Sequence, residues 1–166
     1  MRKFVTWDVD TRFGRGEMFK VRQTPEIIAD EITQSLTVPT YLTGGPRFSL
    51  GVRPLPEGMD FPDDLPEDHP YRHAYMQAAG SHQAMTVELR VPDPADGYTH
   101  YTVARHPVTD PDSWVPLTWD NGGNQPFTTH VHPEEVFTGH QAAPLFRAYI
   151  LHDTTPPPHL LRQLDI

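Results

Sequence analysis

The sequence predicts an α+β fold with a mostly antiparallel sheet and two main helices packed on it. Two segments, 24–36 and 138–152, combine capping residues with the three-to-four-residue apolar spacing of helices. Much of the remaining chain alternates polar and apolar residues in short runs separated by turn residues, which is typical of strands in hairpins. Helices and strands are unevenly mixed along the chain, and this order favours an antiparallel sheet.

The first expected element is a strand. Residues 4–9 alternate in a pattern that would turn Val5, Trp7 and Val9 toward the core. A glycine-containing turn follows, so residues 18–22 can pair back on this strand as a hairpin.

The first helix is expected to begin at the threonine–proline pair 24–25. A hydroxyl side chain caps a helix well, and proline fits the first helical position. Ile28, Ile32 and Leu36 then recur every four residues on one face. We expect this helix to end before Pro39.

The middle of the chain contains most of the other expected strands. In order, they cover residues 41–43, 48–52, 85–91, 98–105, 114–119 and 127–131. The strongest hairpin prediction joins 85–91 to 98–105, because Asp96-Gly97 between them favours a tight turn. A short helix is expected over 71–79, ending at Gly80.

The second main helix contains a conflict. Thr138 and Gln141 have the spacing of a capping box, and an apolar stripe follows them. Pro144 lies within that stripe, where proline removes a backbone hydrogen bond and clashes with the preceding turn. We therefore expect the helix either to start near His140 or to bend. Residues 160–166 are expected to form a last edge strand.

Residues 54–70 form an acidic, proline-rich stretch within what we expect to be a single domain covering 1–166. They contain five prolines and six acidic residues, with no Lys or Arg and no apolar period, so we interpret them as a long inserted loop. A run of like charges is often only a solvated face. It can also steer association with a basic partner, which is the role that we expect here. The candidate partner-binding carboxylates are Asp60, Asp63, Asp64, Glu67 and Asp68.

Trp119 and Asp120 are further candidates for partner binding. They stand together just before the turn residues 121–124. Aromatic side chains near turns often belong to the core or its rim, but at an interface they act as anchors.

Composition restricts the classes of function. The chain has 13 Lys and Arg against 22 Asp and Glu, a net charge of −9, which does not suit general binding to a nucleic-acid backbone. It has no cysteine, which excludes disulfides, thiolate zinc sites and cysteine catalysis. Its apolar runs are too short to span a membrane. We expect a cytoplasmic protein without a cofactor, a monomer or weak dimer when free, whose partner is a protein with a basic surface.

The densest histidine group predicts an alternative function. His130 and His132 alternate on an expected strand, which would place both imidazoles on one face, and Glu135 could complete a metal site. The pattern is similar to the first cupin motif, Gly-x5-His-x-His-x3,4-Glu-x6-Gly. The spacings from Gly123 to His130 and from His132 to Glu135 each depart from it by one residue, and no second cupin motif follows. A small histidine-dependent metalloenzyme or cupin-like metal-binding domain is therefore the alternative.

Other catalytic arrangements are less specific. His69 and His73 have i, i+4 spacing but lack an intervening glutamate, and the serines lack the context of a nucleophile elbow. We therefore expect that the protein is not an enzyme.

The C-terminal third resembles a known family. Residues 132–137 (HPEEVF), 142–149 (AAPLFRAY) and 161–165 (LRQLD) resemble the first-numbered immunity-protein family of bacterial polymorphic toxin systems. Members of that family are small cytoplasmic α+β proteins, encoded beside secreted toxins that are often nucleic-acid deaminases. The resemblance implies an immunity protein that binds a cognate toxin and occludes its basic active-site cleft. Residues that contact the toxin vary within the family, so none is transferred to this chain. An adaptor for an unrelated basic protein is a third possibility.

Overall fold

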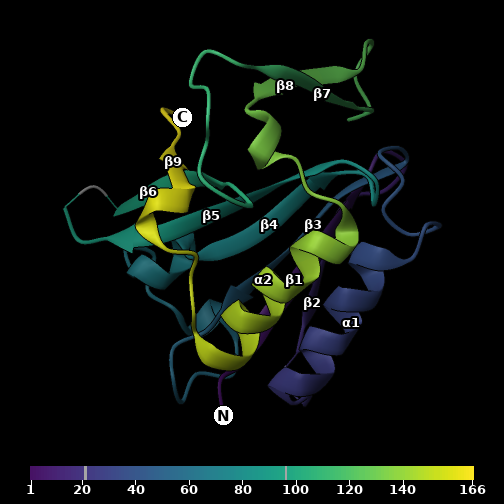
Figure 1. Cartoon of the computed structure of the whole chain (residues 1–166). Coiled ribbons are helices and arrows are strands. Elements are labelled where there is room, and N and C mark those ends of the chain that lie inside the picture. Colours follow the sequence, from purple (N-terminus) through teal and green to yellow (C-terminus); the bar gives the residue numbers. More distant parts are fainter. Residues whose placement is uncertain (21, 96) are drawn as a thin grey trace.

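The computed structural model describes residues 1–20, 22–95 and 97–166. It confirms the α+β prediction: two helices lie on one face of a seven-stranded antiparallel sheet, and a two-stranded ribbon stands apart from it (Figure 1). Val21 and Asp96 lie outside the described residues. The expected strand over 18–22 and the expected turn at Asp96-Gly97 therefore fall partly outside them.

The large sheet has the strand order β2-β1-β3-β4-β5-β6-β9, and β7 and β8 form the ribbon. The strands are β1 (Phe4–Asp10), β2 (Gly14–Phe19), β3 (Arg47–Pro54), β4 (Tyr75–Gly80), β5 (Met85–Asp93), β6 (Gly97–Val103), β7 (Val115–Trp119), β8 (Phe127–Val131) and β9 (Leu161–Gln163). The helices are α1 (Pro25–Thr37) and α2 (Gly139–His152). Four short 3₁₀ turns are η1 (Pro62–Asp64), η2 (Pro70–His73), η3 (Pro133–Glu135) and η4 (Pro158–Leu160).

Helix α1 begins and ends as its sequence predicts. The Thr24 hydroxyl accepts a hydrogen bond from the Ile27 N–H at 3.3 Å, and proline occupies the first helical position. The expected apolar stripe, which includes Ile28, Ile32 and Leu36, is buried.

Helix α2 starts at Gly139 and continues through its proline. The predicted capping box is present: the Thr138 hydroxyl accepts from the Gln141 N–H at 3.3 Å, and the Gln141 side chain accepts from the Thr138 N–H at 2.9 Å. Pro144 cannot donate to the carbonyl of His140, but both residues are exposed, where water can hydrate that carbonyl. The two hydrogen bonds of the capping box thus fix the start of a helix that the proline alone would disfavour.

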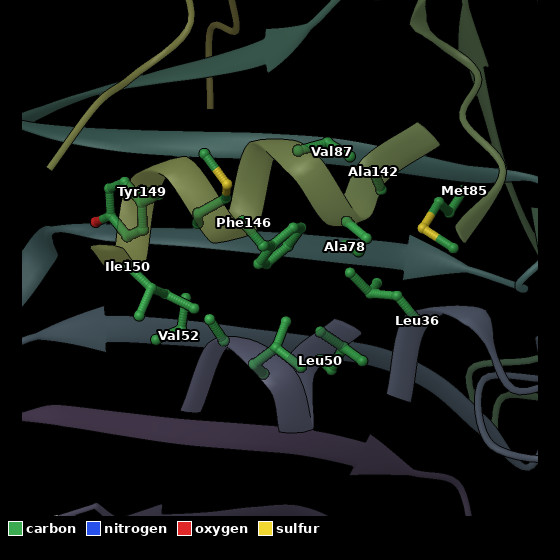
Figure 2. Close-up of a cluster of buried hydrophobic side chains, with 14 of the residues drawn as sticks. Leu36, Leu50, Val52, Ala78, Met85, Val87, Ala142, Phe146, Tyr149 and Ile150 are labelled. Atoms are coloured by element: carbon green, nitrogen blue, oxygen red, sulfur yellow. The ribbon is translucent and has the colours of Figure 1, made fainter. Parts of the chain in front are cut away.

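The main core lies between the two helices and the sheet. Figure 2 shows Phe146 of α2 among side chains from β3 and β4, with Ile150 of the same helix close to Val52. The expected strand over 85–91 is confirmed, and its alternating residues Met85, Val87 and Leu89 are all buried in this cluster.

The face of β1 that meets the helices differs from the prediction. Val5 and Trp7 are buried as expected, but Val5 belongs to a smaller cluster with Leu55 and Leu65, while Phe4 belongs to the main core. The segment that carries Leu55 and Leu65 packs on the face of the sheet that the helices leave free. Alternation could not reveal this, because β1 is covered on both faces.

Two other expected elements are wrong. The predicted helix over 71–79 is instead η2 followed by β4, a strand inside the sheet. The Ala-rich stretch at 76–79 tolerates either state, and pairing with β3 and β5 decides between them. The predicted strand over 41–43 is reduced to a single bridge between Thr43 and Ser81.

A buried carboxylate closes the β1–β2 hairpin. Asp10 is buried, and its Oδ1 accepts from the Arg12 backbone N–H at 2.8 Å and from Arg12 Nε at 3.0 Å. Its Oδ2 accepts from Arg12 Nη2 at 2.8 Å. The Arg12 hydrogen bonds hold the pKa of Asp10 at about 2, below the ordinary 3.8.

This pKa predicts an acid-sensitive hairpin. Because the folded-state pKa is depressed, the stabilisation is complete above the ordinary pKa and is lost as the pH falls toward about 2. Replacing Arg12 by Gln is expected to raise the pKa of Asp10, measured by carboxyl-carbon NMR titration. Arg22→Gln, at an exposed position, is the matched control. An unchanged Asp10 titration in the Arg12 variant would contradict the assignment.

No helix in the described ranges has the length and hydropathy to cross a membrane.

Candidate protein-binding surface

The acidic segment, residues 57–68, lies in the connection between β3 and β4. All five carboxylates that the sequence singles out are exposed: Asp60, Asp63, Asp64, Glu67 and Asp68. Among the described residues, no side-chain ion pair involves any of these five. Glu57, at the start of the segment, does have a partner, since it lies 3.4 Å from the N-terminal ammonium group. The five carboxylates are therefore available to an external cation.

Buried leucines hold the acidic segment against the sheet. Leu55 and Leu65 pack with Val5 in the smaller core cluster, and the side chains of Met59 and Tyr71 add to it. Arg72 then donates from Nε to the carbonyl of Pro66 at 2.7 Å, and from Nη2 to the carbonyl of Leu65. These contacts fix the path of the backbone, so its exposed carboxylates have less conformational freedom to lose on binding.

An exposed aromatic side chain stands within the acidic segment. Phe61 is 49% exposed and immediately precedes η1, where its carbonyl accepts from the Asp64 N–H at 3.2 Å. Sequence reasoning missed Phe61 because it considered only the charges of this stretch. The available signal was an aromatic residue without helix or strand periodicity between acidic and proline residues. Aromatic anchors of this kind contribute much of the affinity at protein interfaces.

Trp119 and Asp120 are engaged within the ribbon. The half-buried ring of Trp119 lies 4.9 Å from that of Phe127, its cross-strand neighbour. Asp120 is exposed, but its Oδ1 accepts from the Gly122 N–H at 2.9 Å and its own N–H donates to the Gly44 carbonyl at 2.8 Å. Trp119 therefore packs within the hairpin, whereas Asp120 shapes its turn and attaches it to the loop that precedes β3.

The structure does not bring these two residues together with the acidic segment. The acidic segment is anchored at Val5, near the start of β1, whereas Gly122 of the ribbon meets Thr11, just after its end. A seven-residue strand spans roughly 20 Å. The acidic segment and the Trp119–Asp120 pair are therefore separate surfaces. The acidic segment is the stronger candidate, and a binding role for Trp119 and Asp120 stays a prediction.

The alternative metal site is not formed. Strand β8 ends at Val131, so His132 begins the following turn instead of extending the strand. His130 is exposed, whereas His132 is buried with its ring 3.8 Å from that of Trp114. Across the described ranges, no three His, Cys, Asp or Glu side chains are grouped so as to hold a metal ion.

The third residue of that alternative has a structural partner. Both carboxylate oxygens of buried Glu135 accept from the Arg162 guanidinium at 2.9 Å. Oε1 also accepts from the His132 N–H at 2.7 Å. Glu135 thus joins η3 to β9.

A cleft of about 330 Å³ lies between α1 and the β1–β2 hairpin. Several of its polar groups already have partners. Lys20 Nζ donates to Glu31 at 2.8 Å, and the Tyr41 hydroxyl donates to Asp8 at 2.8 Å. Hydrogen bonding to Asp8 and burial of the ring both raise the pKa of Tyr41, with burial the larger cause. These pairs act to join the helix and the loop after it to the sheet.

Comparison with protein-family models, curated proteins and solved structures finds no match to this chain. Its function is therefore inferred from its own surface. In the acidic segment, exposed carboxylates, an aromatic side chain and an anchored backbone occur together.

Proposed function

We propose that this protein is an immunity-type inhibitor that binds a basic protein toxin and neutralises it by covering the active-site cleft of that toxin. The observation that carries the proposal is the acidic segment. It presents Phe61 among five exposed carboxylates that form no ion pair with another described residue, and Leu55 and Leu65 anchor it.

Charge and aromatic surface have different roles in this proposal. The carboxylates attract a basic protein over a distance and so raise the association rate. Phe61 would enter an apolar pocket of the toxin and slow dissociation. The combination suits an inhibitor that must bind quickly and remain bound.

A toxin that acts on nucleic acid fits this surface. Such an enzyme must attract phosphates, so its cleft carries cationic side chains. Carboxylates of the inhibitor can pair with those cations and exclude the substrate, and the net charge of −9 favours the same encounter. The resemblance of residues 132–165 to immunity proteins supports a deaminase as the class of toxin and the cytoplasm as the place of action.

The first test is co-expression with the toxin encoded beside this gene. We expect growth to be rescued and the two proteins to purify together. Failure of both would contradict the proposal. Co-purification with a basic protein that is not a toxin would instead support the adaptor function.

The second test measures how the acidic segment contributes. A variant with Asp63→Asn, Asp64→Asn and Glu67→Gln is expected to associate with the toxin about tenfold more slowly at low salt. This difference should nearly vanish at about 1 M salt, where the Debye length is about 3 Å. Phe61→Ala is expected to raise the dissociation rate instead.

A matched control separates local from overall charge. Glu26→Gln, Asp112→Asn and Asp165→Asn remove the same charge at exposed positions outside the acidic segment. Association should slow much less in this variant. Equal slowing in both variants would show that only net charge matters and would exclude the segment as the binding surface.

A further inference from the structure

Strand β2 leaves one of its sides free. It is an edge strand of the large sheet (Figure 1). All of its residues are exposed. The Lys20 N–H donates to the Phe4 carbonyl of β1 at 2.9 Å. Because backbone groups alternate in direction, those of Arg15, Glu17 and Phe19 face away from β1. Outward N–H and C=O groups at a sheet edge are a template for another strand.

Large apolar side chains gather at this edge. Phe13 is 82% exposed, Met18 is 58% exposed and Phe19 is 50% exposed. Single exposed apolar residues are common, but here three lie within seven residues along one free strand and its turn. The edge therefore offers apolar contact area as well as hydrogen bonds.

We propose that two copies of this chain associate by antiparallel pairing of their β2 strands about a two-fold axis at Gly16. Antiparallel pairing places residues with outward backbone groups opposite one another. With the axis at Gly16, Arg15 of each copy lies opposite Glu17 of the other. An axis at Arg15 would oppose two arginines, and an axis at Glu17 would oppose two glutamates. Charge complementarity therefore selects the Gly16 register.

The same register also suits the neighbouring side chains. Met18 of one copy lies opposite Gly14 of the other. Phe13 of one copy, in the turn before β2, comes beside Phe19 of the other. At the axis Gly16 faces its own counterpart, so no side chain separates the two strands there. Arg15 and Glu17 are only 2.9 Å apart within one copy, and pairing would extend them into a network of four alternating charges. Such self-complementarity is what a two-fold interface requires.

The dimer goes beyond toxin binding and is tested without the toxin. Sedimentation equilibrium of the full chain, from about 1 μM to about 1 mM, should show a reversible monomer–dimer equilibrium. Glu17→Arg and Arg15→Glu each create like-charge pairs, and each should weaken dimerisation at least about fivefold. The double variant Arg15→Glu/Glu17→Arg restores opposite charges and should restore the dimer. Asp112→Arg, which makes the same charge change as Glu17→Arg outside the edge, should have little effect.

Hydrogen exchange identifies the interface. The outward amides of Arg15, Glu17 and Phe19 should gain protection as the protein concentration rises. A protein that stays monomeric throughout, or a dimer that the charge swap fails to restore, would overturn the proposal. Protection that arises only when the toxin is added would mean that β2 accepts a foreign strand, and this would also overturn self-pairing.

Discussion

Replacing Gly139 by alanine is expected to destabilise the fold by about 3 kcal/mol or more, although alanine is the better helix former. Gly139 is the first residue of α2 and lies against the C-terminal end of α1. A Cβ here would overlap the Leu36 carbonyl oxygen and stand 2.6 Å from its carbon and 3.3 Å from the Thr37 Cα.

These atoms are backbone, so no side-chain rotation can make room. The N–H of Gly139 also donates to the His82 carbonyl at 2.7 Å, which limits how far α2 can move away. Separating the helices would open the core that Figure 2 shows, and close-packed interiors resist such movement. The steric cost therefore exceeds the gain of about 1 kcal/mol in helix propensity.

Urea unfolding measures this loss. His140→Ala, at the next and exposed position, also raises helix propensity without contacting α1 and should leave stability nearly unchanged. A Gly139→Ala protein as stable as the wild type would show that the two helices can separate freely.

Replacing Arg162 by methionine is expected to cost about 3–5 kcal/mol, because it leaves the buried Glu135 carboxylate without its cation. The ion pair joins the last strand to η3, and Glu135 has a second partner in the His132 N–H. Replacing Arg162 therefore disturbs the contact between η3 and β9, at the two ends of the C-terminal third.

Chemical denaturation of the single and double variants separates charge from packing. Glu135→Gln in the Arg162→Met background removes the unpaired charge while its amide oxygen can still accept from His132. The double variant is expected to regain at least about 1 kcal/mol over Arg162→Met. Arg22→Met, at an exposed position, serves as a control for loss of a surface cation. If the double variant is no more stable than Arg162→Met, the unpaired charge of Glu135 is not the cause of the stability lost in Arg162→Met.

Local sequence signals predicted both helices. Each has its own capping residues and an apolar stripe, so the information lies within one short segment. The capping box of α2 also outweighs the conflicting signal of Pro144. The hairpin strands around residues 85–103 were predictable for the same reason.

Nonlocal packing explains what could not be predicted. Strand β4 looks helical in isolation and becomes a strand because β3 and β5 pair with it. The face of β1 could not be chosen from alternation, because the segment carrying Leu55 and Leu65 covers its second face. Of the candidate surface, the charges were visible in the sequence, whereas the exposure of Phe61 and the distance to Trp119 depend on the fold.

The acidic segment keeps its anchors separate from its exposed chemistry. Leu55 and Leu65 hold it to the sheet, while Phe61 is half exposed, the five carboxylates are exposed, and none of them belongs to a core cluster of the described residues. Substitutions at these outer positions should therefore carry little penalty in folding. For the binding role that we propose, specificity could therefore change one residue at a time while the scaffold stays the same.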